Sequence, residues 1–184
     1  MTDVLTLEDV DESVKSKVYV QDYTAQKQIA GAKLVNIDHI VGDDGGFAEV
    51  MRLKDNGEME LFPKFKLAQV NRTRLIPGNL KAWHLHFKQD EIWYILPRYQ
   101  LLVGLWDIRK NSSTRGVSLK FNLGGGKSQL LFIPRGVAHG SINLSLKEVE
   151  MFYFMSQQFN IKDPDEQRVP WDSLGADFWK PHRD

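Results

Sequence analysis

The sequence predicts an all-β protein, and two observations lead to this expectation. Short runs rich in branched aliphatic and aromatic residues recur from about residue 32 onward, and Gly, Pro, Asn or Ser separates most of them. The turns recur at spacings of roughly 8 to 12 residues, which is typical of a β-sandwich or barrel. We expect one domain over residues 1–184, with a few short helical turns, a polar and frayed lead over 1–17, and a tail over 180–184.

The expected strands follow one another along the chain, and each is a short apolar or alternating run that ends at a turn. The pair Asn56-Gly57 is a strong hairpin signal between two of them. The aromatic and Pro-rich segment 163–184 is expected to pack as short turns over the β structure. The strands are expected at 32–40, 47–53, 59–65, 66–75, 81–87, 91–96, 100–108, 117–123, 128–133, 138–144 and 148–159.

Composition and charge exclude several classes of function. Lys plus Arg and Asp plus Glu both number 24, so the net charge is zero and gives no basic surface for nucleic acid or membrane. The absence of cysteine excludes disulfides and thiolate chemistry. The acidic start of the chain lacks the apolar region of a secretory signal, and no run approaches the roughly 20 apolar residues of a membrane span. We therefore expect a cytoplasmic protein with no nucleic-acid or membrane partner.

Two histidines occupy alternate positions of the run KAWHLHF over residues 81–87. Residues two apart in a strand share a face, so His84 and His86 are expected to point to the same side. Buried imidazoles need polar partners. Glu91 after the next turn and His139 on a later strand are candidates for a shared site.

The spacing of these residues resembles the two sequence motifs of the cupin superfamily. GNLKAWHLHFKQDE places Gly78 six residues before His84, and PRGVAHGSIN ends in a Pro-x-Gly-x-x-His pattern. The resemblance implies a double-stranded β-helix, also described as a jelly-roll barrel. Three imidazoles and a carboxylate also suit a divalent metal such as Fe, Mn, Zn or Ni. One interpretation is therefore a metal-dependent enzyme with the ligands His84, His86, Glu91 and His139.

A longer resemblance points to the dTDP-4-dehydrorhamnose 3,5-epimerase family. It rests on WDIRKNSSTRGVSLKFNL, LLFIPRGVAHGSINLS and EVEMFYF, with GDDGGF and AQVNRT upstream, and covers about residues 35–179. That family implies a homodimer without a metal or other cofactor. A histidine removes a proton alpha to the ketone of a nucleotide-linked sugar, and a tyrosine returns one from the other side.

The resemblance assigns candidate roles residue by residue. His86 maps to the proton-abstracting histidine, and His139 would orient or polarise the carbonyl. The substrate-binding candidates are Gln69, Asn71, His84 and Lys88.

Several family positions are altered in this chain. Gly45 and Trp83 replace family arginines, and Phe159 stands where we expect the catalytic tyrosine. His84 stands at a family glycine and completes the possible metal set. We expect this chain to have a truncated form of the family's C-terminal stretch, which supplies an aspartate behind the catalytic histidine. The sequence therefore predicts a nucleotide-sugar epimerase. A metal-dependent enzyme and a non-catalytic module that binds a sugar nucleotide or another small ligand are the alternatives.

Overall fold

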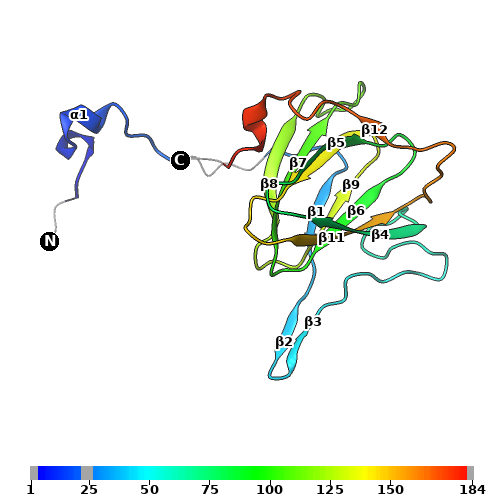
Figure 1. The fold of residues 1–184 in the computed structure, drawn as a ribbon. Helices are drawn as coiled ribbons and strands as arrows, with labels where there is room; N and C mark the ends of the chain where they lie inside the picture. Colours follow the sequence, from blue (N-terminus) through cyan, green and yellow to red (C-terminus); the bar gives the residue numbers. More distant parts are fainter. Residues whose placement is uncertain (1–3, 22–26, 182–184) are drawn as a thin grey trace.

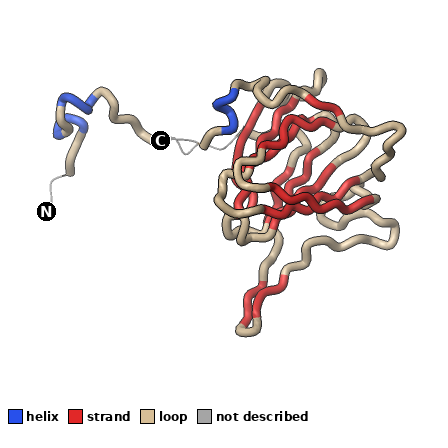
Figure 2. Tube along the Cα trace, in the orientation of Figure 1, coloured by secondary structure: helices blue, strands red, loops and turns tan. Residues whose placement is uncertain are grey.

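The computed structural model describes residues 4–21 and 27–181, and β-strands dominate it (Figures 1 and 2). The helical segments are short, as expected: η1 (Leu7–Asp9), α1 (Glu12–Lys15) and η2 (Ala176–Trp179). The strands are β1 (Lys33–Asn36), β2 (Ile40–Gly42), β3 (Gly45–Phe47), β4 (Gln69–Leu75), β5 (Leu80–Leu85), β6 (Glu91–Ile95), β7 (Gln100–Asp107), β8 (Ser118–Gly124), β9 (Gln129–Ile133), β10 (Val137–Ile142), β11 (Val149–Met155) and β12 (Gln167–Arg168).

Two five-stranded antiparallel sheets form the body, with the orders β1-β9-β6-β11-β4 and β12-β5-β10-β7-β8. Strands of both sheets contribute to one apolar core, which includes Trp93, Val103, Leu131 and Met151. The jelly-roll fold class is confirmed. The sequence analysis expected a closed barrel, whereas no ladder of hydrogen bonds joins the two sheets within the described ranges.

The segment between β3 and β4 differs from the prediction. Strands were expected at 47–53 and 59–65, but this segment forms irregular loops with two isolated bridges, Leu53 to Met59 and Glu58 to Lys66. Its apolar side chains pack in a cluster with Tyr94 of β6 and Phe154 of β11. The residues next to these two in sequence face the core between the sheets, so Tyr94 and Phe154 face the other side of the first sheet. The loop therefore covers the outer face of the first sheet, and its apolar residues do not alternate along a strand.

The C-terminal segment covers the outer face of the second sheet, as expected. The indole rings of Trp83 and Trp179 lie 4.7 Å apart between centroids, and both side chains are buried. Gly104 on β7 allows this contact, because a Cβ atom there would lie 2.7 Å from the Trp179 ring. The sequence analysis missed β12, a two-residue strand that pairs with β5.

An irregularity in the β5–β10 pair shapes the interior. His139 pairs with His84, but Ser141 pairs with Lys81, so three steps along β5 match two steps along β10. This β-bulge turns both Lys81 and His84 toward the space between the sheets. Gly140 permits the close approach, since a Cβ atom there would lie 2.5 Å from the Cβ of Ala82.

The β2–β3 hairpin projects from the sandwich (Figure 1). It exposes Ile40, Val41 and Phe47 to more than 60% each. Within the described ranges, no helix is both long enough and apolar enough to cross a membrane. The cytoplasmic location and the division of the chain into domains stay predictions.

Candidate functional site

A cavity of about 490 Å³ lies between the two sheets. The first sheet contributes side chains from β4, β6 and β11, and the second contributes side chains from β5 and β10. The segment 157–166 completes the lining on the way to β12. The sequence-predicted residues Asn71, His84, His86, Lys88, Glu91 and His139 all line this cavity.

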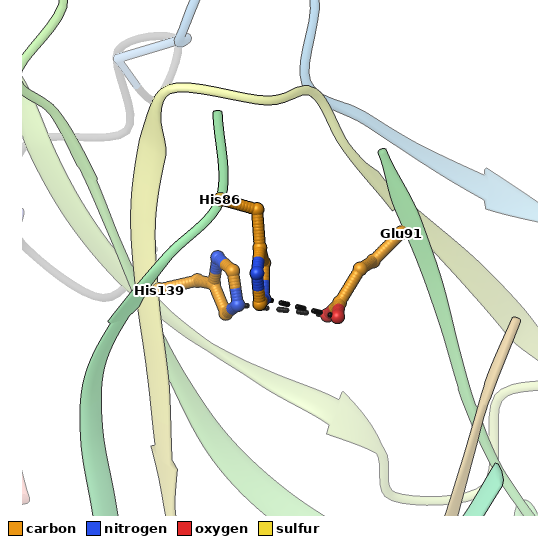
Figure 3. Close-up of side chains that lie close together, drawn as sticks. All are labelled: His86, Glu91 and His139. Carbon is orange, nitrogen blue, oxygen red and sulfur yellow. Dashed lines mark ion pairs between the residues drawn. The ribbon is translucent and has the colours of Figure 1, made fainter. Parts of the chain in front are cut away.

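The side chains of His86, Glu91 and His139, all in its lining, point toward one another (Figure 3). The Nε2 atom of His86 lies 3.1 Å from Oε1 of Glu91, and Nε2 of His139 lies 3.5 Å from Oε2. All three residues are buried. His86 follows β5 and His139 lies on β10, whereas Glu91 begins β6, so the cluster joins the two sheets.

Glu91 carries a negative charge in this cluster. Burial disfavours that charge, but the hydrogen bond with His86 and the nearby imidazoles lower the pKa of the carboxyl group to about 2. Two further donors hold the carboxylate in place. Gln89 Nε2 donates to Oε1 at 2.9 Å, and the indole of Trp93 donates to Oε2 at 2.8 Å.

The two ring nitrogens of His86 have different environments. Its Nδ1 contacts the backbone carbonyl of Asp165, so Nδ1 carries the hydrogen and Nε2 is the nitrogen that can gain or lose a proton. Burial alone would lower the pKa of His86, but the hydrogen bond and charge of Glu91, with the Asp165 carbonyl, raise it above its ordinary value. The sequence analysis expected this chain to lack the stretch that supplies the family's aspartate behind this histidine; in the structure the backbone carbonyl of Asp165 lies there.

His139 has the same tautomer but a different charge tendency. Its Nδ1 donates to the carbonyl of Val137 at 3.0 Å, which leaves the lone pair of Nε2 facing Glu91. Burial lowers the pKa of His139, and the opposing charge of Glu91 does not reverse this. The edge-on ring of Trp93, 5.3 Å away between centroids, fixes the imidazole from the side.

His84 lines the same cavity but lies outside the cluster. Its Nε2 accepts from Nη1 of Arg168 at 2.6 Å, and its Nδ1 lies 3.4 Å from a Glu166 carboxylate oxygen. Burial and the neighbouring His139 lower the pKa of His84 to about 3, so this imidazole is neutral. Of the four metal ligands that the sequence suggested, the structure brings His86, Glu91 and His139 together, and His84 lies apart from them.

Asp165 organises the turn between β5 and β6. Its carboxylate accepts from the backbone N–H groups of Phe87, Lys88 and Gln89 at 2.8, 2.6 and 2.9 Å. The Lys88 ammonium pairs with Asp163 at 2.6 Å at the exposed rim. The segment before β12 therefore fixes the backbone next to His86.

Two predicted substrate contacts lie near the cavity in different ways. Asn71 lines the cavity, whereas Gln69 does not and instead bonds to two residues that do. Gln69 Nε2 donates to Oδ1 of Asn71 at 2.9 Å. Gln69 Oε1 accepts from the backbone N–H of Phe159 at 2.8 Å. Phe159 lines the cavity and is half-exposed.

A phenol is present in the cavity at Tyr153. The sequence analysis placed the catalytic tyrosine position at Phe159 and treated Tyr153 only as a match within a family strand. Tyr153 pairs with Asn71 on β4 and Trp93 on β6, and all three line the cavity. Burial raises the pKa of the Tyr153 hydroxyl, although the amide of Asn71 opposes this, so the phenol keeps its proton.

Alternation along the strands would have identified some of the missed residues. Met151, Tyr153 and Met155 alternate on β11, and Gln89 and Trp93 flank Glu91 at the same spacing. No sequence pattern indicated Asp165, Glu166 or Arg168, because they reach the site through the chain reversal before β12.

Comparison with known proteins agrees with this geometry. The family model described as dTDP-4-dehydrorhamnose 3,5-epimerase matches residues 26–180. The chain belongs to this family. The family predicted from the sequence is therefore confirmed, and so is its class, the isomerases and epimerases of nucleotide sugars.

Two curated proteins are similar to this chain in sequence. The spore coat polysaccharide biosynthesis protein SpsL of Bacillus subtilis is 36% identical over 150 residues, which cover 82% of this chain and 95% of that protein. The probable low-salt glycan biosynthesis epimerase Agl13 of Haloferax volcanii is 28% identical over 128 residues, 70% of this chain and 79% of that protein.

Solved structures of the family share the fold. The dTDP-4-dehydrorhamnose 3,5-epimerase of Bacillus anthracis, with TDP and pyrophosphate bound, has a TM-score of 0.71 at 20% identity, over 86% of this chain and 90% of that one. The epimerase RmlC of Legionella pneumophila, in complex with dTDP-4-keto-L-rhamnose, has a TM-score of 0.70 at 23% identity, over 86% and 83%.

Proposed function

We propose that this protein epimerises a nucleotide-linked keto-sugar by removing and returning a proton at a carbon next to the ketone. The observation that carries the proposal is the cavity between the sheets, where the His86–Glu91 pair and the phenol of Tyr153 come from different strands. Family membership and relatives named as epimerases support it. The reaction needs no cofactor, because the substrate's own ketone makes the neighbouring C–H acidic.

His86 is the proposed base. Its Nδ1–H is held by the Asp165 carbonyl, so Nε2 accepts the proton. The imidazolium that forms is stabilised by the Glu91 carboxylate 3.1 Å away. His139 is proposed as a positioning residue, since its only N–H donates to Val137 and its Nε2 has no hydrogen to offer a carbonyl.

Tyr153 is the proposed acid. Its raised pKa keeps the hydroxyl protonated at neutral pH, and its place on β11 puts it on the sheet opposite His86. A proton taken by His86 and a proton delivered by Tyr153 on the other face of the carbanion carbon would invert that carbon.

Lys81 is a cation within the cavity. Lys81 is exposed, and its Nζ donates to Thr73 at 2.8 Å, which holds the ammonium at the cavity lining. We assign it to the oxygen that becomes negative when the proton leaves. Asn71, His84 and Lys88 remain the proposed contacts for the rest of the substrate, with Gln69 as the support of Asn71.

Solvent exchange tests the proposal. The protein is mixed with dTDP-4-keto-6-deoxyglucose in deuterated water, and deuterium at C3 and C5 is followed by NMR. Incorporation above the rate of the protein-free control supports the proposed function. Tight binding of this and related nucleotide keto-sugars without exchange would identify the non-catalytic module instead.

The predicted homodimer is part of the proposal. The exposed apolar side chains of the β2–β3 hairpin, Ile40, Val41 and Phe47, support it, because such residues usually gain from being covered. Sedimentation at several concentrations tests it, and a mass of one chain throughout would exclude a stable dimer.

A further inference from the structure

The substrate class of the proposed function needs a cation that the proton transfer does not supply. A nucleotide-linked sugar such as a dTDP-sugar carries a negatively charged diphosphate, and proteins bind phosphates with Arg or Lys. Two lysines, Lys81 and Lys88, are in the cavity lining. The Lys88 ammonium pairs with the Asp163 carboxylate at 2.6 Å, and Lys81 is assigned to the ketone oxygen. We therefore expect a further cation beside the cavity.

Arg168 lies at the edge of the cavity. It is on β12, the edge strand of the second sheet, and pairs with His84 of β5. Directly paired residues of neighbouring strands point to the same face of a sheet. The Arg168 side chain therefore leaves the sheet on the same side as His84, which lines the cavity. Backbone hydrogen bonds in both directions between Trp83 and Val169, at 3.2 Å each, fix the chain next to it.

A neutral imidazole orients the Arg168 guanidinium. Nη1 of Arg168 donates to Nε2 of His84 at 2.6 Å. Burial and the neighbouring His139 lower the pKa of His84 to about 3, so the ring accepts from the guanidinium and does not repel it. The Arg168 side chain keeps 56% of its surface exposed, which leaves room for a ligand.

A carboxylate already contacts the other end of the guanidinium. Nη2 of Arg168 donates to Oε1 of Glu166, and Nδ1 of His84 lies 3.4 Å from the same oxygen. Glu166 lines the cavity and is exposed. A phosphate oxygen makes the same kind of charged hydrogen bond to Arg as this carboxylate oxygen does. Exposed ion pairs are weak, so an incoming phosphate can displace Glu166.

We propose that Arg168 binds the diphosphate of the nucleotide-linked sugar, that the phosphate displaces Glu166, and that His84 positions the guanidinium. The identity of the substrate rests on the proposed function, whereas binding of a diphosphate by Arg168 is measured without turnover. Arginine suits this role because its planar guanidinium donates two parallel hydrogen bonds to one phosphate. Glu166 keeps the guanidinium paired while the diphosphate is absent.

The test measures binding to the full chain by titration calorimetry. The ligands are dTDP, UDP and inorganic pyrophosphate, and pyrophosphate separates recognition of the diphosphate from recognition of a base. Arg168→Gln should weaken binding of each ligand by about 10–100-fold, because charged hydrogen bonds to the phosphates are lost. Arg168→Lys keeps the charge without the planar fork and should recover part of this loss.

Glu166→Gln should have the opposite effect. The amide oxygen still accepts from Arg168, but it carries no charge that competes with the phosphate. Binding of pyrophosphate should therefore become tighter by about two- to fivefold. A glutamate that only stabilised the fold would not give tighter binding when it is replaced. Unchanged or weaker binding by folded Glu166→Gln would overturn the displacement of Glu166 by phosphate.

Arg72→Gln is the matched control. Arg72 is similarly exposed and also pairs with a glutamate, Glu150, at 3.2 Å. It lies between Asn71 and Thr73 on β4, which line the cavity, so its side chain points to the other face of the sheet. This variant should bind pyrophosphate within about twofold of the unaltered protein. Circular dichroism and thermal melting show whether each variant is folded.

Two results would overturn the role of Arg168. One is folded Arg168→Gln that binds dTDP and pyrophosphate as tightly as the unaltered protein, and the other is an unaltered chain that binds none of the three ligands. Solvent exchange into dTDP-4-keto-6-deoxyglucose separates this inference from the proposed function. Weaker binding by Arg168→Gln, with no exchange by the unaltered protein, would leave the diphosphate contact standing and remove the proposed function. Exchange by the unaltered protein, with diphosphate binding unchanged in Arg168→Gln, would do the reverse.

Discussion

His84 and His139 face each other across β5 and β10, with ring centroids 6.0 Å apart, yet they serve different partners. His139 faces Glu91 on the opposite sheet, whereas His84 accepts from Arg168 on the neighbouring β12. The two histidines on alternate positions of KAWHLHF therefore have different places: His86 belongs to the buried cluster with Glu91 and His139, and His84 lies in the cavity wall.

The substitution His84→Gln should affect binding of the substrate more than the chemical step. Glutamine keeps an oxygen that can accept from Arg168 but loses the flat imidazole surface of the cavity wall. We expect KM for the nucleotide keto-sugar to rise several-fold while kcat stays within about threefold. Steady-state kinetics checks this, and a fall in kcat at unchanged KM would place His84 in the chemical step.

Tyr153→Phe should separate the two halves of the proposed reaction. The variant keeps His86, so it should still exchange the substrate proton with solvent. The variant should no longer donate a proton to the face of the carbanion carbon opposite His86, so the rate of epimer formation should fall by about 10²-fold or more. Product stereochemistry by NMR distinguishes the two. Tyr99→Phe, outside the cavity, is the matched control, and normal epimer formation by Tyr153→Phe would exclude the assigned role.

Asp165→Ala should loosen the turn that carries His86. Three backbone N–H groups lose a carboxylate acceptor, so we expect the free energy of unfolding to fall by about 1–3 kcal/mol. Asp163→Ala removes only an exposed pair with Lys88 and should cost about 0–1 kcal/mol. Urea unfolding compares them. Equal losses in the two variants would show that the Asp165 carboxylate contributes no more to the free energy of unfolding than the exposed Asp163–Lys88 pair does.

Asp107 should give the protein part of its acid sensitivity. The carboxylate is fully buried and bonds to Arg109, Ser112 and Thr114. The Arg109 guanidinium and the two hydroxyls hold the pKa of Asp107 far below its ordinary value, although burial opposes them. The stability from a depressed pKa is fully present above the unfolded value of about 3.9 and is lost as the pH falls below it.

The substitution Asp107→Asn tests this account. It should lower the free energy of unfolding at pH 7 by about 3–5 kcal/mol, because Arg109 loses its buried partner. The variant should also lose less stability than the unaltered protein between pH 5 and pH 3. Asp172→Asn on the surface is the control. An unchanged slope of stability against pH in Asp107→Asn would contradict the assignment.

Much of the fold could be predicted because the strands are short apolar runs with clear turns. The family and the shared face of His84 and His86 followed from motif spacing. The strand expected at 59–65 was wrong, because Met59, Phe62 and Phe65 belong to a loop that packs on the outer face of the first sheet. The alternation of apolar residues alone does not distinguish such a loop from a strand. The separation of His84 from the cluster depends on Arg168, 84 residues away, and no local pattern carries that information.

The phenol of Tyr153 was missed for a related reason. A motif alignment places the family's tyrosine position at Phe159, which lines the cavity, and the pairing of β11 with β4 and β6 brings Tyr153 into the same lining. Strand register decides which side chains face inward, and register between distant strands is set by the whole sheet.

Hydrogen–deuterium exchange at the sugar carbons of a nucleotide keto-sugar, compared between the unaltered protein and its His86→Gln variant, tests the central claim most directly. The account predicts deuterium next to the ketone with the unaltered protein and a rate at least about 100-fold lower with folded His86→Gln. Equal rates in the two proteins, or no exchange by either, would contradict it.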